Sequence, residues 1–560
     1  MKKTRFIAML LVLSFCLAVT ACNSSSTEST TAAGAETEKQ TDKQTEEETE
    51  KETTDAETAA EGQEDEGRGG DPIAFSYLRP VWSNPTYEKG NEYEQMFSKI
   101  ANVEISANII PVADFNSKVI VMIAGGTDID VIWNMGPGNP SIYDIIDQGA
   151  FLPLNDLLEK YPSTKDAIYD ATWDRLVSPD GNYYFFPNPL NVFVPFPIYY
   201  RTDIIEELGL EIPTTIDEFT DFLRDIHEAK PEMVTFTTSE LFSEWYFQNI
   251  YNAFGYNHGW MEDPDNPGTI IPSNITKYNK DALEWINLLR REGLIDPDYM
   301  IAAGKRGSDT FKAGNAAVIA INWDSYQDLM IELRKNVPEA GIGLITSLEG
   351  PGGISGADSL TGYDRGFSLN ISAADKADDI FRFLDWVYTD GYIINRYGFE
   401  GKTYNVDDKG NIIVIPSDER DPAFNNSNVD PFKFPIRSED TSPNWLNYYN
   451  DFMKNGLSVE DLEVMRFAYE DAVANYVPNL DKQTYSPTQA QIGTQLNEEY
   501  LRPAFEKLMI DPDADISIFD EAVEAWLANG GQAIIDEINA AQADKSAPVY
   551  NYENTGPDYR

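Results

Sequence analysis

The sequence has few of the residues that build cross-linked or reactive sites. It holds two cysteines, Cys16 and Cys22, and two histidines in 560 residues. Cys16 lies in an N-terminal apolar run that we expect to be removed, so the mature chain would keep one cysteine and form no internal disulfide. With only two histidines in the sequence, we do not expect a metal site or an acid–base site built on histidine. We therefore expect no metal and no cofactor.

Positive charge is also scarce. The chain has 42 Lys and Arg against 94 Asp and Glu, a formal net charge of −52. Nucleic-acid binders present basic faces, so this balance excludes that class of partner. Apart from the N-terminal run, no segment approaches the roughly 20 apolar residues that a membrane span requires. The composition predicts an acidic, exported protein without a second membrane segment.

The N-terminus has the pattern of an export signal. Lys2, Lys3 and Arg5 precede an apolar run over residues 6–19, the length and flanks of a secretory signal. The run ends in VTAC at residues 19–22, which resembles a bacterial lipobox. An ordinary signal peptide cleaved nearby would leave Cys22 there by chance. We predict a lipoprotein signal peptide over residues 1–21 and diacylation of Cys22, which would hold the protein on the outer face of the cell membrane.

The segment after the signal lacks the large apolar residues that pack into a hydrophobic core. Residues 23–70 contain no aromatic residue, leucine, isoleucine or valine. Such a stretch cannot offset the entropy lost on ordering. We predict a disordered acidic tether over residues 22–70, followed by a body over residues 71–560 that is long enough for two or more domains.

The body begins with alternating strand and helix patterns. We expect strands over residues 73–78, 103–110 and 129–133, and helices over 91–100 and 114–124, with Asp114 as a cap. Another strand is expected over 198–201, followed by a helix that Thr215 caps, with Glu218 completing a capping box. A further strand is expected over 318–322. Helices are expected over 283–291, 379–388 and most of 458–541. This alternation favours an open α/β sheet.

Five segments in order resemble a known family. They are residues 124–133 (AGGTDIDVIW), 180–187 (DGNYYFFP), 199–219, 311–318 (FKAGNAAV) and 397–404 (YGFEGKTY) with the turn at 407–411. Together they resemble the family 1 extracellular solute-binding proteins, in particular the large lipoprotein subgroup, and more distantly the maltose-binding protein. Ile129 stands where the family usually has proline.

The resemblance implies an α/β fold of the two-lobed, periplasmic-binding-protein-like type II, a flytrap with hinge crossovers and a helical C-terminal region. Lobe 1 would comprise residues 71–194, lobe 2 residues 195–365, a return to lobe 1 and hinge residues 366–435, and the helical region, packed on both lobes, residues 436–560. Crossovers are expected near 193–198, near 365–368 and within 412–434.

The resemblance also implies a function. The protein would not be an enzyme; it would capture a carbohydrate, most simply an oligosaccharide, and deliver it to the permease subunits of an ABC importer, acting as a monomer. Two alternatives stay open: an extracellular carbohydrate-active enzyme, which would need two carboxylates about 5–10 Å apart, and a binding protein for a peptide or another non-sugar ligand.

A sugar binder needs flat aromatic rings and planar polar groups. Trp133 and Trp323 end or follow strands where the resemblance implies sugar-stacking residues, and further rings are available, although each could instead fill a core. The further aromatic candidates are Trp82, Trp245 and Tyr246. The polar candidates are Asp324, Asp364, Arg365 and Glu400. Convergence of several arginines on the cleft, for example Arg79 with Arg365, would favour an acidic sugar such as a uronide.

Overall fold

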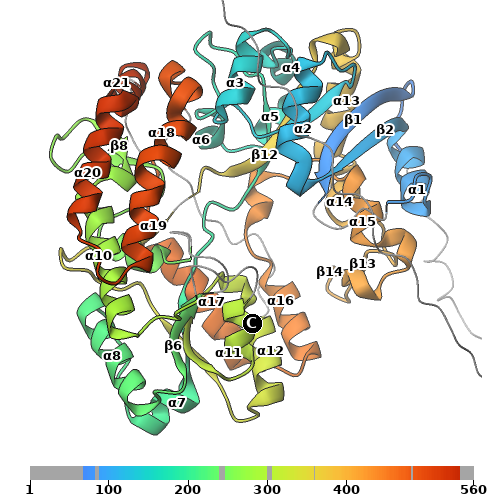
Figure 1. The fold of residues 1–560 in the computed structure, drawn as a ribbon. Helices are drawn as coiled ribbons and strands as arrows, with labels where there is room; N and C mark the ends of the chain where they lie inside the picture. The colour runs from blue at the N-terminus through green and yellow to red at the C-terminus, as the bar shows by residue number, and fades with distance from the viewer. Residues whose placement is uncertain are drawn as a thin grey trace, which may run out of the picture. The chain divides into compact units, whose positions relative to one another are not determined.

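The computed structural model describes residues 67–81, 87–238, 246–298, 306–358, 360–480 and 484–542. Its strands form two larger mixed sheets, each with its own set of helices (Figure 1), and three two-stranded sheets within the described residues. We call the sheet that contains the first strand, with its helices, lobe 1, and the other larger sheet with its helices lobe 2. None of the described helices combines the length and apolar character that a membrane span requires.

The lobe 1 sheet has the strand order β2-β1-β3-β12-β4. Its strands are β1 (Ile73–Val81), β2 (Val103–Pro111), β3 (Val131–Asn134), β4 (Phe186–Pro189) and β12 (Tyr363–Leu369). β1 pairs in parallel with β2 and β3, whereas β12 runs antiparallel to β3 and β4. The carboxyl ends of β1 and β3 therefore lie at one edge, the position where open α/β sheets bind ligands.

Lobe 1 helices bury their apolar stripes against this sheet. Phe97 of the first helix, Phe115 of the second and Phe383 of α13 belong to one core with Phe75 of β1. The helices of this lobe are α1 (Glu92–Ala101), α2 (Val112–Ala124), α3 (Pro140–Asp147), α4 (Asn155–Lys160), α5 (Pro162–Asp166), α6 (Asp170–Trp173), α13 (Ala377–Tyr388), α14 (Tyr392–Tyr397) and α15 (Asn426–Val429). A hairpin of β13 (Tyr404–Val406) and β14 (Ile412–Val414) follows α14, with its turn at the expected position 407–411.

The lobe 2 sheet has the order β10-β5-β9-β6. Its strands are β5 (Ile198–Arg201), β6 (Val234–Thr238), β9 (Ala316–Ala320) and β10 (Ile342–Ile345). β9 is buried along its whole length because helices cover both of its faces, as its continuous apolar sequence AAVIA indicates. The helices are α7 (Thr202–Leu208), α8 (Ile216–Ala229), α9 (Gln248–Ala253), α10 (Lys277–Glu292), α11 (Arg306–Lys312), α12 (Tyr326–Asn336), α16 (Trp445–Lys454) and α17 (Val459–Ala474).

The chain passes between the lobes three times in the described residues. The first passage, residues 190–197 between β4 and β5, agrees with the expected 193–198. The second lies at residues 346–362, before the expected 365–368, because those residues already pair within β12. The third lies at residues 435–444, after the expected 412–434, because Phe424, Val429 and Phe432 pack into the lobe 1 core.

The C-terminal region contacts elements of both lobes. It contains β15 (Tyr476–Val477), α18 (Thr494–Leu496), α19 (Arg502–Ile510), α20 (Ser517–Trp526), α21 (Gln532–Ala541) and three π-helical turns, Gln489–Gly493, Asn497–Leu501 and Leu527–Gly531. β15 pairs with β11 (Ala357–Asp358), and the helices cover the hairpin of β7 (Trp260–Glu262) and β8 (Ile270–Pro272). Tyr485 stacks on Tyr143 of α3, and Arg175 donates to the Asn479 carbonyl over 2.9 Å. The predicted domain limits stay predictions.

Two capping predictions have different outcomes. Thr215 caps α8 by accepting from the Glu218 amide at 3.2 Å, as expected, but the Glu218 carboxylate accepts from Thr214 instead of Thr215. The Asp114 cap is wrong, because α2 starts at Val112 directly after Pro111. Asp114 sits inside the first turn, where its carboxylate pairs with Lys118 at 2.8 Å.

Candidate functional site

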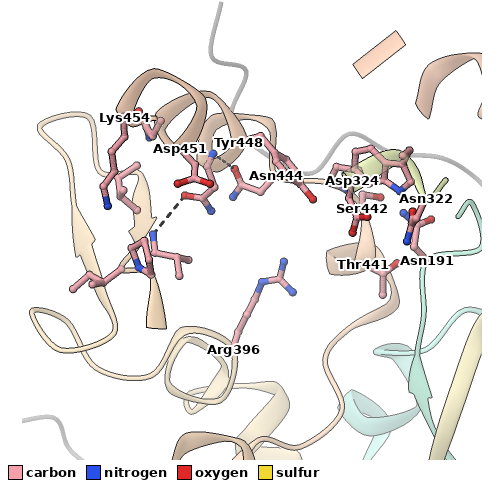
Figure 2. Close-up of a pocket in the computed structure, with 18 of the residues that line it drawn as sticks. Asn191, Asn322, Asp324, Arg396, Thr441, Ser442, Asn444, Tyr448, Asp451 and Lys454 are labelled. Atoms are coloured by element: carbon pink, nitrogen blue, oxygen red, sulfur yellow. Dashed lines mark hydrogen bonds between the residues drawn. The ribbon is translucent and has the colours of Figure 1, made fainter. Parts of the chain in front are cut away.

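A cavity of about 1040 Å³ lies where elements of the two lobes meet. Lobe 1 contributes Arg396 of α14 and the hairpin with the segment after it; lobe 2 contributes the loop after β9 and one face of α16. The first and third passages between the lobes complete the lining. Figure 2 shows polar side chains from these elements around the space, with Arg396 extending into it below α16.

The end of β9 positions Trp323 and Asp324. The strand stops at Ala320, and the chain turns through a 3₁₀ segment, Trp323–Ser325, before α12. The Trp323 amide donates to the Pro195 carbonyl at 3.1 Å, and the Tyr199 hydroxyl donates to the Trp323 carbonyl at the same distance. These bonds tie the loop to the first passage between the lobes. Both residues line the cavity, and their role as ligand contacts stays a prediction.

Trp323 belongs to an aromatic cluster. Its ring lies 5.8 Å from Trp445, 5.7 Å from Tyr448 and 5.0 Å from Tyr469, measured between centroids, in edge-on and tilted arrangements. Only 6% of Trp323 is exposed, so most of the ring is packing surface and a small part faces the cavity. Half-buried Tyr448 is the larger open aromatic surface of this wall.

One face of α16 forms the rest of the lobe 2 wall. Asn444 caps the helix by accepting from the Asn447 amide at 3.1 Å, and Asn447 in turn accepts from the Val414 amide of β14 at 3.5 Å. The cavity-lining residues of this helix recur at helical spacing: Asn444, Asn447, Tyr448, Asp451 and Lys454. The sequence analysis missed this face. The signal was present in the run NWLNYYN at residues 444–450, which mixes amides and aromatic rings.

Asp324 lines the cavity as an exposed residue, and no cation pairs with its carboxyl group among the described residues. Burial raises its pKa above the ordinary value. Burial also raises the pKa of the Tyr448 hydroxyl, with smaller contributions from the charges of Asp324 and Asp451. The wall therefore offers a neutral phenol donor beside carboxyl acceptors, an arrangement suited to a ligand with many hydroxyl groups.

Trp133 occupies a different environment. It lies at the carboxyl edge of β3 as expected, but its indole Nε1 donates to the Tyr77 hydroxyl and only 2% of the residue is exposed. The guanidinium of Arg79 lies 5.1 Å from the centre of its ring. In this structure the Trp133 ring therefore packs in the core and contacts the Arg79 guanidinium, and it does not line the cavity. Its role as a ligand contact stays a prediction.

Four of the remaining candidates, Tyr246, Asp364, Arg365 and Glu400, lie apart from the cavity lining. Asp364 and Arg365 form an ion pair on β12, and Glu400 is exposed in the turn after α14. Tyr246 packs edge-on against Phe196 of the first passage, with centroids 5.3 Å apart. Trp82, Trp245 and Cys22 lie outside the described residues. In the part of the chain that is described, no group of three or more His, Cys, Asp or Glu side chains could hold a metal ion.

The sequence pattern of the family described as bacterial extracellular solute-binding protein matches residues 83–393, more than half of the chain. The chain belongs to this family. As a solute-binding protein it is not an enzyme, and it has the family's two-lobed type II fold.

Curated relatives of this solute-binding protein span most of its length. Lipoprotein LipO of Bacillus subtilis (strain 168) is 23% identical over 488 residues, covering 84% of this chain and 92% of LipO. The polygalacturonan/rhamnogalacturonan-binding protein YtcQ of the same organism is 23% identical over 461 residues, covering 79% and 86%. The crystal structure of the alginate-binding protein AlgQ2 without calcium ion has the same fold, with a TM-score of 0.62 at 17% identity over 85% of this chain and 99% of AlgQ2.

Proposed function

We propose that this solute-binding protein captures an oligosaccharide in the cavity between its lobes and presents it to the permease of an ABC importer. The observation that carries the proposal is the composition of the cavity: about 1040 Å³ in volume, with an aromatic cluster on one side and amide, hydroxyl and carboxyl groups around it. Cavities of roughly 300–1,000 Å³ accommodate ligands of drug size, so this one has room for several sugar units.

The polar groups suit sugar hydroxyls. Asn322 and Asn444 of the lining each carry a donor and an acceptor in one plane. Asn191 already donates to the Tyr469 hydroxyl and accepts from the Phe193 amide. The carboxyl oxygens of Asp324 can accept from two neighbouring hydroxyls. The open ring of Tyr448 offers an apolar face for the C–H side of a sugar. Each sugar unit could therefore find both kinds of contact.

Relatives support a saccharide as the ligand class. YtcQ is named for binding polygalacturonan and rhamnogalacturonan, and AlgQ2 for binding alginate. FusA of Streptococcus pneumoniae, a fructooligosaccharide ABC transporter substrate-binding protein, is 23% identical over 215 residues. We extend only the shared class, an oligosaccharide, to this chain.

Trp323 and Asp324 are the sequence-predicted residues that we propose as ligand contacts in the present arrangement. The other candidates are proposed to reach the ligand only after the lobes change their relative position, as hinged binding proteins do around a ligand. They are Trp82, Trp133, Trp245, Tyr246, Asp364, Arg365 and Glu400. We further propose that the chain acts as a monomer held on the outer face of the membrane through diacylated Cys22.

Thermal unfolding of the full chain in the presence of neutral and acidic oligosaccharides tests the function. A ligand at 100 times its dissociation constant adds about 2.7 kcal/mol to the stability of the folded state. For a chain of this length the midpoint should rise by roughly 2 °C. Titration calorimetry then measures the affinity of each hit. Midpoint shifts with peptides and none with any oligosaccharide would contradict the proposal.

A further inference from the structure

Four cationic side chains gather on the lobe 1 side of the cavity, in a chain with 94 acidic and 42 basic residues. We call Arg79, Arg396, Arg420 and Lys433 the cationic cluster. Arg396 lines the cavity directly, and Arg420 donates over 2.6 Å to the carbonyl of Ile415, another lining residue. Arg79 donates over 2.6 Å to the carbonyl of Lys433. The cluster thus connects the carboxyl end of β1 with the cavity wall.

The cluster has fewer carboxylates than cations. Lys433 lies 4.0 Å from Asp430, and Arg396 lies 3.6 Å from Asp440, both long for ion pairs. In the described parts of the chain, no carboxylate comes within ion-pair distance of the other two cations. Arg79 donates to the main-chain carbonyls of Asp430 and Lys433, and Arg420 donates to a carbonyl and an asparagine side chain. Four positive charges therefore face two negative ones.

The cations differ in exposure: the side chain of Lys433 is 37% exposed and that of Arg396 is 15% exposed. Arg79 is 6% exposed, and its Nε is buried without a hydrogen-bond partner. Burial lowers the pKa of Lys433, and the positive charges of Arg420, Arg79 and Arg396 lower it further against the opposing effect of Asp430. Burying charge without a counter-charge costs stability. Binding of an anion would therefore stabilise such a cluster.

We propose that the cationic cluster binds the carboxylate of a uronic acid unit, so that the oligosaccharide captured by this cavity is acidic. The inference rests on the proposed function and adds the charge of the ligand to it. Arg396 is the residue placed for direct contact, because its side chain extends into the cavity (Figure 2). Arg79, Arg420 and Lys433 supply positive potential behind it.

Three acidic side chains, Asp324, Glu419 and Asp451, also line the cavity. Glu419 is paired with Lys454, and the Asp451 carboxylate accepts from Gln327 at 2.8 Å. Asp324 lies on the lobe 2 wall, opposite the side from which Arg396 extends. A uronide would therefore direct its carboxylate toward lobe 1 and its hydroxyls toward lobe 2.

Titration calorimetry on the full chain tests the proposal with a matched pair of probes: trigalacturonate and the same trisaccharide with its carboxyl groups reduced to hydroxymethyl groups. At 50 mM NaCl we expect the acidic trimer to bind at least tenfold more tightly. The preference should shrink toward 500 mM NaCl because salt screens charge. Two further probes are titrated in parallel: trimannuronate, and a trimer of uncharged sugars that carries sulfate groups, called the sulfated trimer. They separate recognition of uronate from recognition of any anion.

Substitution of the contact residue sharpens the test. Arg396→Gln should bring the ratio of the two affinities close to one, because it should weaken binding of trigalacturonate more than binding of the reduced trimer. Arg396→Lys should keep part of the preference. Arg382→Gln, the same change on an exposed arginine of α13, should leave both affinities unchanged.

The outcomes separate the two proposals. Equal or tighter binding of the reduced trimer, or a preference that Arg396→Gln leaves intact, overturns the assignment of the cationic cluster. The oligosaccharide function would still stand if neutral sugars bound. Tighter binding of the sulfated trimer than of both uronides also overturns uronate as the ligand group. If no saccharide of either charge binds, the proposed function itself fails.

Discussion

The two walls of the cavity differ in chemistry and in how they are held. The lobe 2 wall presents Tyr448 and part of Trp323 with the carboxyl groups of Asp324 and Asp451. Aromatic packing holds it: Trp323 lies between Trp445, Tyr448 and Tyr469. The lobe 1 wall presents Arg396, and Arg79 of the cationic cluster is held by the main-chain carbonyls of Asp430 and Lys433.

The difference assigns separate tasks to the two lobes. Apolar and aromatic contact contributes most of the free energy in many binding sites, whereas charge complementarity sets specificity and the rate of encounter. The lobe 2 wall should therefore hold any oligosaccharide of suitable shape, and the lobe 1 wall should select among them by charge. Substitutions on the two walls should consequently change different observables.

The largest effect is expected from Tyr448→Ala on the aromatic wall. Removal of the open ring should weaken oligosaccharide binding by about 2 kcal/mol, roughly 30-fold in dissociation constant, as for a central aromatic contact. Acidic and neutral ligands should lose affinity equally, because the ring carries no charge. Calorimetric titration of both trimers measures this.

Tyr449→Ala is the matched control, since Tyr449 is on the same helix, is also half-buried and does not line the cavity. It should leave the affinity within about threefold of the original. A large loss with this control, or a loss at Tyr448 confined to acidic ligands, would contradict the separation of tasks. Trp323→Ala is a poorer test, because removing a buried tryptophan costs about 3–5 kcal/mol of stability by itself.

A smaller effect is expected from Asp324→Asn. The amide keeps the shape but loses the charge-assisted acceptor, so the affinity for the reduced trimer should fall about tenfold. The loss should be smaller for trigalacturonate, because the change also removes a negative charge near an anionic ligand. Since burial raises the pKa of Asp324, the free protein should unfold at an equal or higher temperature than the parent at pH 7.

Asp328→Asn controls for the loss of one negative charge, as this exposed carboxylate pairs with Lys312 on the surface. It should change neither affinity measurably. A lower unfolding temperature for Asp324→Asn with unchanged binding would mean that this carboxyl group stabilises the loop after β9 and makes no ligand contact.

The fold could be predicted from the sequence, and so could the position of one residue pair, Trp323 and Asp324, after a buried strand. Alternating strand and helix patterns placed β1, β2 and β5 within a few residues, because those segments have the period of a buried sheet. Trp323 and Asp324 were predictable because polar or aromatic side chains directly after a buried strand lie at its carboxyl end, where open sheets bind ligands.

The rest of the site depends on packing that no local pattern reports. Trp133 has the same position after a strand as Trp323, yet Tyr77 and Arg79 enclose it. The α16 face was missed because its orientation follows from the burial of Trp445 and Phe452 in the lobe 2 core. The cationic cluster joins residues more than 350 positions apart, such as Arg79 and Lys433, which sequence spacing cannot reveal.

The lobe 1 wall should also respond to pH through Asp440, whose hydroxyl partner is Tyr392. Burial raises the pKa of Asp440 from 3.8 to about 6. Between these values the folded state holds a proton that the unfolded state has lost, so this group stabilises the fold most at low pH and its contribution is lost as pH rises through 6.

Comparison of the parent with Asp440→Asn isolates this contribution. The difference in unfolding free energy, parent minus variant, should fall by about 2 kcal/mol between pH 4 and pH 7, because a shift of one pKa unit corresponds to about 1.4 kcal/mol. Urea unfolding at several pH values measures it. A difference that does not change with pH would mean that Asp440 titrates alike in both states.

The smallest effect is expected where the two walls touch. Lys454 at the end of α16 pairs with Glu419 after the lobe 1 hairpin, and both side chains are about half exposed, at 50% and 46%. Exposed pairs contribute about 0–1 kcal/mol and weaken in salt. Lys454→Met, Glu419→Gln and the double variant should therefore show a coupling energy below about 1 kcal/mol in urea unfolding, reduced further in 0.5 M NaCl. A coupling well above this value would mean that the pair clamps the lobes together, and the two walls could then no longer be treated as independent contributors to binding.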